Sequence, residues 1–265
     1  MDKLETIAGT PVWVTQWGHE GARVVMVHGS AQGSEVGGDR HFSAQQRLAE
    51  RGWQVIVPDR PGHGRSPSPG RPDDAQADGA LVAELLGDGA HLVGHSFGGA
   101  VALAAAAMRP GAVRSLTLIE PAMQMLAVDH PLVRRFGLRI LAIELFSLSA
   151  ASKARKFSRL VGIPDEIGGS RPPDEMQRMG VALGKLKLPG KAELQQQLAT
   201  IRQARIPLWV VTGGWSPAFE VVADRVAAAG GGTHQVIASP HHFPQMVSDE
   251  FNDSLARFMQ RAANA

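Results

Sequence analysis

The sequence contains no cysteine, and this absence excludes three kinds of chemistry. Without thiols the chain can form no disulfide, no thiolate metal site and no cysteine nucleophile. It also has no apolar run near the roughly 18 residues that span a bilayer, so we expect no membrane partner. Residues 1–5 lack the basic-then-apolar profile of a signal peptide, and we expect a cytoplasmic protein.

An excess of charge of one sign is also missing. The chain has 27 Lys and Arg against 25 Asp and Glu, and its formal net charge is +2. No Lys/Arg block is dense enough to follow a phosphate backbone, so we expect no nucleic-acid partner. Hydrophobic residues at 44% and charged residues at 20% are typical of a globular protein, here a monomer or a homodimer.

Strand-like and helix-like patterns alternate over much of the chain. Strand-like runs lie at residues 11–17, 23–27, 53–57, 91–93, 113–119, 207–212 and 234–238, and helical patterns at residues 43–51, 78–86, 100–108, 218–229 and 251–261. The first two runs predict an antiparallel hairpin. Residues 24–27 are continuously apolar, as in strands covered on both faces. The alternation predicts an α/β protein whose mostly parallel sheet has helices on both faces.

The alternation stops between residues 122 and 205, where no buried strand is evident. Helical patterns at residues 132–148, 152–160, 174–186 and 192–203 replace it. This segment is therefore a helical insertion. We expect a core domain of residues 1–121 and 206–265, interrupted by a second, helical domain of residues 122–205.

The segment Gly94-His95-Ser96-Phe97-Gly98 fits the pattern G-x-S-x-G of a nucleophile elbow, between a short strand and an alanine-rich helix. A serine in such a strained turn needs glycines two positions before and after it, where the strand and helix backbones pass closely. The free N–H groups of the helix N-terminus can then stabilise an oxyanion. The alternatives are an ordinary Gly-rich turn between strand and helix, and a nucleotide-binding loop. The second lacks G-x-G-x-x-G and G-K-[ST] here, and we expect no cofactor.

Four motifs, taken in order, resemble those of α/β-hydrolases. They are His28-Gly29, Asp59-Arg60-Pro61-Gly62-His63-Gly64-Arg65-Ser66, Gly94-His95-Ser96-Phe97-Gly98-Gly99 and His241-His242-Phe243-Pro244-Gln245. The resemblance covers essentially the whole chain. It implies the α/β-hydrolase fold, with a mostly parallel eight-stranded sheet, and it makes residues 122–205 the cap domain.

The resemblance also implies a role for several residues. Ser96 is the expected nucleophile, and a serine needs a base within hydrogen-bond reach. His242 matches the histidine of the family's H-F-P-Q segment and is preferred to His241, which stands where glycine is common. The oxyanion hole is expected to use the backbone N–H groups of Ser30 and Phe97. The histidine pair lacks the spacing and further ligands of a zinc site, so we expect no metal.

The triad acid departs from the usual pattern. Most of the family places an Asp in the segment that reads Thr212-Gly213-Gly214-Trp215-Ser216-Pro217 here, which contains no acid. Glu120, at the end of the preceding strand, resembles the alternative acid of haloalkane dehalogenases and of the zearalenone-lactonase branch. A carboxylate there can accept from the imidazole and fix its tautomer. We therefore predict Glu120 as the acid and keep Glu220 in reserve.

A serine nucleophile predicts acyl transfer through an acyl-enzyme, with a Ser-His-Glu triad. The triad layout resembles the zearalenone-lactonase branch, so an apolar ester or lactone, aromatic ones included, is the expected substrate. The predicted substrate-binding residues are Met123, Leu126, Leu141, Leu145, Met176, Trp215 and Phe243, each of which could instead fill the core. A C–C bond hydrolase, a cofactor-free perhydrolase and a non-catalytic ligand-binding homologue remain alternatives.

Overall fold

Eight strands form one sheet in the computed structural model, which describes residues 2–30, 32–34, 42–164 and 172–264. The strands are β1 (Asp2–Ile7), β2 (Thr10–Trp17), β3 (Arg23–Val27), β4 (Gln54–Pro58), β5 (Ala90–His95), β6 (Val113–Ile119), β7 (Leu208–Thr212) and β8 (Thr233–Val236). Their order is β1-β2-β4-β3-β5-β6-β7-β8. The six strands from β4 to β8 in this order run parallel, which confirms the predicted mostly parallel, eight-stranded α/β sheet.

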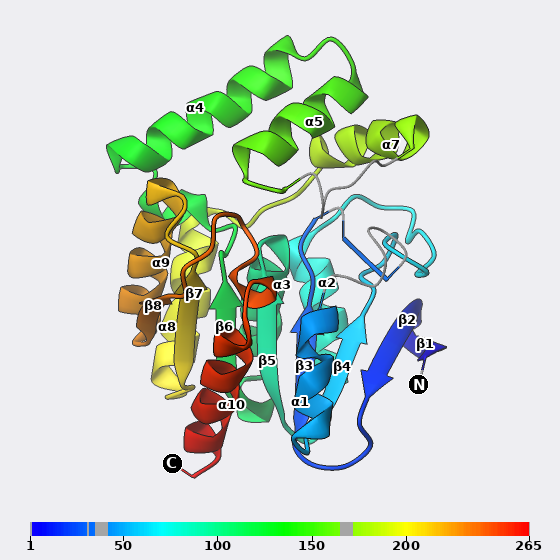
Figure 1. Cartoon of the computed structure of the whole chain (residues 1–265), viewed down its shortest axis with the longest axis vertical. Coiled ribbons are helices and arrows are strands. Elements are labelled where there is room, and N and C mark those ends of the chain that lie inside the picture. Colours follow the sequence, from blue (N-terminus) through cyan, green and yellow to red (C-terminus); the bar gives the residue numbers. More distant parts are fainter. Residues whose placement is uncertain (1, 31, 35–41, 165–171, 265) are drawn as a thin grey trace.

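Helices cover both faces of the sheet (Figure 1). One face packs against α2 (Ala75–Leu85), α3 (Phe97–Met108), α8 (Lys191–Gln203) and α9 (Pro217–Gly230), and the other against α1 (Arg47–Glu50) and α10 (Asp249–Ala263). The central strand β3 is apolar throughout residues 24–27 because it is buried on both faces. Val25 and Val27 join the core on the first face, while Val24 and Met26 join the core on the second. A strand buried on both faces has no polar side.

The predicted hairpin between residues 11–17 and 23–27 is wrong. Strand β2 instead pairs antiparallel with β1 through the turn at Ala8 and Gly9, and with β4 on its other side. Both edges of β3 are occupied by the parallel neighbours β4 and β5, so β2 cannot pair with it. The unpredicted β1 is the edge strand and is mostly exposed, which explains why its sequence has no buried-strand pattern.

Three helices of the insertion stand above the carboxyl ends of the strands (Figure 1). They are α4 (Pro131–Phe146), α5 (Ala150–Leu160) and α7 (Pro173–Leu183). The fourth predicted helix, α8, lies beside the sheet, where its fully buried Leu194, Leu198 and Ile201 are part of the main core. The division into a core of residues 1–121 and 206–265 and a cap of residues 122–205 stays a prediction, and α8 packs with the core layer.

Short 3-10 turns connect several elements, at Ser43–Gln46, Pro110–Ala112, Gln124–Ala127 and Pro244–Met246. The first replaces the first part of the helix predicted at residues 43–51, the rest of which is α1, and Phe42, not Ser43, occupies the N-cap position of the turn. The remaining predicted helices and strands lie within a few residues of their predicted bounds. The carboxyl ends of β3, β5, β6 and β7 meet at one edge of the sheet, below α5 (Figure 1).

Candidate active site

The turn from β5 into α3 holds Ser96 in a left-handed backbone conformation. Its φ is 56° and its ψ is −121°, which is strained for a residue with a side chain. A Cβ added at Gly98 would collide with the carbonyl oxygens of Val27 and His28, and one at Gly94 with that of Gly98. The close approach of α3 to β3 and β5 therefore explains both glycines of G-x-S-x-G.

The structure brings Glu120 and His242 together, although 122 positions separate them in the sequence. Nδ1 of His242 lies 3.3 Å from Oε2 of Glu120. Both side chains are buried, at 3% and 0% exposure. Glu120 also has a positive φ, 46°, at the end of β6. Two of the strained non-glycine residues of the described chain are thus predicted catalytic residues, as is common where strain serves function.

Trp215 supports Glu120 from the position where the family usually carries its acid. The indole Nε1–H of Trp215 and the backbone N–H of Gly213 both donate to Oε1 of Glu120, at 3.1 and 2.7 Å. Burial raises the pKa of Glu120 to about 7, and the two N–H donors act in the opposite direction. This hydrogen bond explains the presence of Trp215 at the site without a substrate stacked on its ring.

His242 is held in place by its backbone. Its N–H donates to the carbonyl of Gly162 at 3.1 Å, and its carbonyl accepts from Nε2 of His95 at 2.8 Å. Burial lowers the pKa of His242 to about 3, so the imidazole is neutral near pH 7, as a general base must be. The hydrogen bonds found among the described residues include none from Ser96 to His242; such bonds often tighten only when substrate binds.

The alternative candidates lie in other contacts. Glu220 accepts from the Thr212 hydroxyl at 2.8 Å and from Gly214 N–H at 3.1 Å, and lies 3.5 Å from His234. It therefore partners His234 rather than His242. His241 contacts the hydroxyl of Ser239 at 3.2 Å. Of the two histidines, His242 is the one whose ring lies against Glu120.

The loop after β3 brings Ser30 beside the elbow. Gly29 packs so closely there that an added Cβ would lie 2.9 Å from the Cβ of Ser96. Gln32 holds this arrangement, because its Oε1 accepts from Gly29 N–H at 2.7 Å and lies 3.2 Å from Nδ1 of His95. Phe97 is the first residue of α3. Sequence reasoning did not identify Gln32, which belongs to no recognisable motif.

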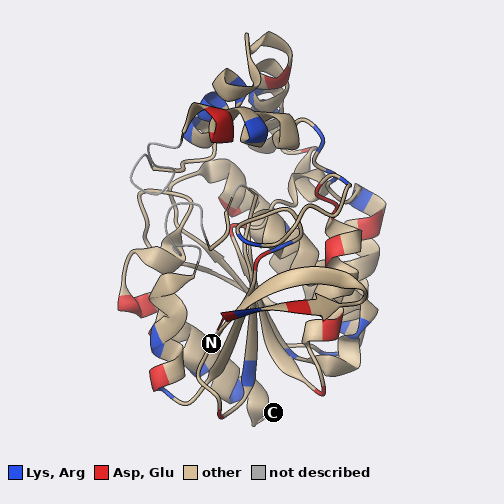
Figure 2. Cartoon of the chain, turned by 90° about the vertical axis from the view of Figure 1, so that its right-hand side faces the viewer, with Lys and Arg blue, Asp and Glu red and all other residues tan. Residues whose placement is uncertain are grey.

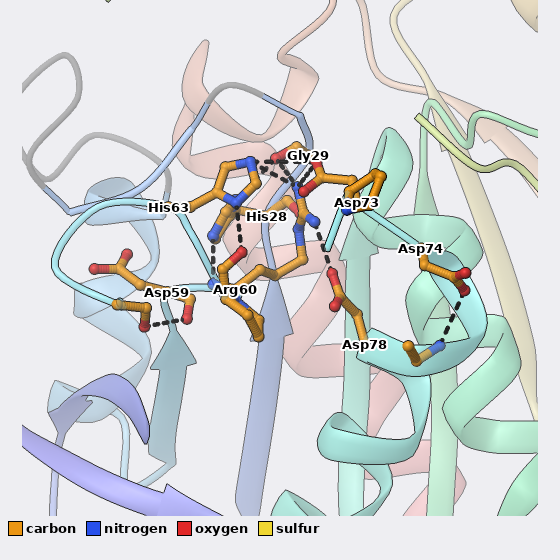
Figure 3. Close-up of polar contacts among 12 residues, drawn as sticks. His28, Gly29, Asp59, Arg60, His63, Asp73, Asp74 and Asp78 are labelled. Carbon is orange, nitrogen blue, oxygen red and sulfur yellow. Dashed lines mark hydrogen bonds and ion pairs between the residues drawn. The ribbon is translucent and has the colours of Figure 1, made fainter. Parts of the chain in front are cut away.

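A buried guanidinium, Arg60, contacts both segments that carry the predicted oxyanion donors, and Figure 3 shows its contacts with His28 and Gly29. Its Nε donates to the carbonyl of His28 at 3.1 Å and its Nη2 to that of Gly29 at 3.0 Å. Its Cζ lies 4.7 Å from the centre of the Phe97 ring. The backbone N–H of Arg60 donates to Nε2 of His28 at 2.9 Å. Arg60 thus braces the loop before Ser30 against the start of α3.

Carboxylates compensate the buried charge of Arg60. Asp78 accepts from Nη1 at 2.8 Å, and Asp73 lies 3.2 Å from Nη2 (Figure 3). Arg71 also donates to Asp78, at 2.6 Å. The Arg60 guanidinium and His63 hold the pKa of Asp73 well below its usual range despite burial. The loop of residues 59–66 is part of a motif visible in the sequence. Its pairing with Asp73 and Asp78 through Arg60 is visible only in the structure.

The predicted substrate-binding residues occupy diverse environments. Met123, Leu126 and Phe243 are buried, and the Phe243 ring lies 4.8 Å from that of His95. Met176 is half-buried on α7. Leu141 and Leu145 lie on the exposed face of α4, so the structure does not bring them to the triad side chains. Their role in binding substrate stays a prediction.

The described part of the chain holds neither a cluster of metal ligands nor a membrane-spanning helix. Among these residues no group of three or more His, Asp or Glu side chains is placed to hold a metal ion. Within the same residues, no helix is both long and apolar enough to cross a bilayer.

A mostly parallel sheet with a strained serine at the turn from a strand into a helix is the arrangement found in α/β-hydrolases. Residues 24–254 match the family described as the alpha/beta hydrolase family. This match covers most of the sequence. The chain belongs to the alpha/beta hydrolase family.

Among curated proteins, lipase LipV of Mycobacterium tuberculosis is 37% identical over 150 residues, which cover 54% of this chain and 53% of LipV. The chain thus spans about half the length of this relative. Among solved structures, the esterase EaEST from Exiguobacterium antarcticum has a TM-score of 0.70 at 19% identity, covering 98% of this chain and 100% of EaEST. Est816, described as an N-acyl homoserine lactone degrading enzyme, has a TM-score of 0.63 at 20% identity, with 96% and 99% covered. At such identities the structures show the fold alone.

The Arg60 cluster yields a prediction on stability. Asp78→Ala leaves the buried guanidinium without its closest carboxylate, and removing one partner of a buried pair costs about 3–5 kcal/mol. Asp174, whose exposed carboxylate pairs with Arg178 at 2.7 Å, provides the control. Asp174→Ala is expected to leave the free energy of unfolding almost unchanged, because water screens an exposed ion pair. Urea unfolding at pH 7 measures both, and equal losses in the two variants would contradict the prediction.

Proposed function

We propose that this protein is a serine hydrolase that cleaves an apolar carboxylic ester or lactone with the triad Ser96, His242 and Glu120. The observation that carries the proposal is the buried Glu120 carboxylate on Nδ1 of His242, next to a serine strained at a nucleophile elbow. A protein that only binds its ligand has no need of a strained serine and a buried carboxylate–imidazole pair.

The arrangement supports acyl transfer in two steps. Ser96 Oγ attacks the substrate carbonyl while His242 Nε2 accepts its proton, and Glu120 stabilises the resulting imidazolium. The N–H groups of Ser30 and Phe97 stabilise the oxyanion of the tetrahedral intermediate. His242 then donates its proton to the leaving alcohol, which stays tethered when the substrate is a lactone. Water, deprotonated by His242, hydrolyses the acyl-enzyme and releases Ser96.

The substrate class rests on chemistry and on relatives. LipV is named a lipase, EaEST an esterase and Est816 an enzyme that degrades N-acyl homoserine lactones. The first two names describe enzymes that act on open carboxylic esters, and the third names a substrate that contains a lactone. The layout resemblance to the zearalenone-lactonase branch remains a prediction. A comparison of kcat/KM for aromatic lactones and short-chain p-nitrophenyl esters tests which of the two classes is preferred.

Replacing Glu120 tests the triad. In Glu120→Gln the amide can still accept from Gly213 and Trp215, but its NH₂ group then faces Nδ1 of His242. This favours the tautomer with the proton on Nε2, which cannot accept from Ser96. We expect kcat to fall about 10³–10⁴-fold with p-nitrophenyl esters. Glu220→Gln, the matched control in the neighbouring cluster, should stay within about threefold of wild type.

Labelling by a fluorophosphonate provides the second readout. Ser96 should be labelled in the wild type and not in Ser96→Ala, and labelling should be slow in Glu120→Gln. An unlabelled Ser96 in the wild type would disprove the hydrolase proposal. A loss of turnover in Glu220→Gln with near-full turnover in Glu120→Gln would move the acid to Glu220.

The pH dependence follows from the raised pKa of Glu120. The carboxylate must be ionised to stabilise the imidazolium, so kcat/KM should rise with pH through an inflection near 7. Trp215→Phe removes one N–H donor from the carboxylate while keeping an aromatic ring. Loss of a donor to the charged form raises the pKa of Glu120 further, so the inflection should move to higher pH. A downward shift, or none, would contradict this assignment.

The same carboxyl group links stability to pH in the opposite direction. Its pKa rises from 4.5 to about 7 on folding, so the folded state favours the protonated form. Stability from this group is complete below about pH 4.5 and is lost as pH rises through 7, by roughly 3 kcal/mol. Glu120→Gln should therefore melt higher than wild type at pH 8.5 and similarly at pH 4.5. Thermal denaturation followed by circular dichroism measures this, and a lower melting temperature at pH 8.5 would contradict it.

A further inference from the structure

The outer face of α4 carries large apolar side chains that lie exposed. Leu138, Leu141 and Leu145 are 60%, 50% and 65% exposed and recur at helical spacing on one face. Phe146 and Leu148, at the end of the helix, are 73% and 99% exposed. We call these five residues, together with the basic residues described next, the outer cap face.

The opposite face of α4 is apolar as well. Val133 and Phe136 are buried, and Ile140 and Ile143 pack against the main core. Phe136 meets Phe219 of α9 edge-to-face, with ring centres 5.5 Å apart. This inner face explains how α4 is attached, so the outer leucines are not needed for folding. A row of exposed leucines is unusual on a helix that is already attached by its other face.

Basic side chains accompany the exposed leucines. Residues 131–160, which form α4 and α5, hold seven Lys and Arg and one Glu, a formal charge of +6. The whole chain has +2, so all other residues together carry −4. Arg134, Arg135 and Arg139 are exposed on α4, and Glu144 pairs with Lys153 at 2.5 Å. Figure 2 shows Lys and Arg on the helices at the top of the molecule.

We propose that the outer cap face, Leu138, Leu141, Leu145, Phe146 and Leu148 with Arg134, Arg135 and Arg139, docks on an anionic lipid surface. The apolar side chains enter the boundary between headgroups and acyl chains, while the guanidinium groups bind lipid phosphates at the level above. The helix lies in the plane of the interface and does not cross it. This mode is compatible with the lack of a spanning helix among the described residues.

Charge decides between a lipid surface and a second copy of the chain. A two-fold symmetric dimer through this face would bring together the exposed guanidinium groups of Arg134, Arg135 and Arg139 from two copies, on helices whose residues 131–160 carry +6 in each copy. Such a contact is repulsive at moderate ionic strength. An anionic bilayer offers apolar volume and negative charge together, and each basic residue near its surface adds to the attraction.

Docking would also orient the molecule. The cap helices stand above the carboxyl ends of the strands, the edge at which Ser96, Glu120 and His242 lie (Figure 1). With α4 on the bilayer, this edge of the sheet faces the lipid and the opposite end of the molecule faces water. The docking does not depend on the proposed hydrolysis, since it uses none of the triad residues.

Co-sedimentation with large unilamellar vesicles tests the proposal. Vesicles of phosphatidylcholine with 30% phosphatidylglycerol should pellet the wild-type protein at low salt, and vesicles of phosphatidylcholine alone should pellet much less. Raising NaCl from 50 to 500 mM should release the protein. Binding that is equal on both vesicles, or absent from anionic ones, would disprove the docking surface.

Two variants separate the apolar and the charged contributions. Leu138→Gln/Leu141→Gln/Leu145→Gln should weaken partitioning at least tenfold, because apolar area no longer enters the lipid. Arg134→Gln/Arg135→Gln/Arg139→Gln should weaken it about a hundredfold at low salt. All six side chains are exposed, so thermal denaturation should be almost unchanged.

Matched variants elsewhere on the surface provide the controls. Leu4→Gln/Met108→Gln/Val236→Gln removes three exposed apolar side chains, and Arg47→Gln/Arg51→Gln/Arg225→Gln removes three exposed charges, all outside the cap. Both should bind anionic vesicles like wild type. If the leucine variant also binds like wild type, the attraction is charge alone and the proposal is wrong. A dimer seen by light scattering, lost in the leucine variant without any vesicle binding, would instead assign the face to a second copy.

Discussion

The close approach of α3 to the ends of β3 and β5 is the constraint on which the site depends. At Gly98 the helix passes so near the carbonyls of Val27 and His28 that no side chain fits. This contact forces Ser96 into its left-handed conformation and places the first turn of α3 beside the loop that carries Ser30. A single steric requirement therefore brings the proposed nucleophile and both predicted oxyanion donors together.

In the proposed triad, the acid Glu120 comes from a different strand than the aspartate of most of the family. The segment after β7 carries no acid, but its Gly213 and Trp215 donate to Glu120 at the end of the adjacent strand β6. Because β6 and β7 run parallel and neighbour each other, their carboxyl ends deliver side chains to the same point. Burial of this carboxyl opposes its ionisation. If Glu120 is the triad acid, as we propose, activity and stability therefore have opposite pH preferences.

Two further features lie outside the triad. Arg60 and its carboxylates form a buried polar network that braces the loop before Ser30, one of the predicted oxyanion donors. The helices α4 and α5 differ, because they carry basic side chains at the surface, beside exposed leucines.

Local patterns in the sequence were sufficient for the α/β fold class, for most helix and strand bounds and for the elbow at Ser96. These features depend on spacing within a few residues: strand and helix periodicity, and glycines where backbones meet. The positions of Glu120 and His242 were predicted from motif order, whereas their 3.3 Å contact is seen only in the tertiary structure.

Only the structure decided the partners of Glu120, the contacts of Arg60 with Asp78, and the place of β1 in the sheet. It also decided the exposure of Leu141 and Leu145. Each depends on segments distant in sequence that meet through sheet order and helix packing, and such contacts leave no periodic signal along the chain.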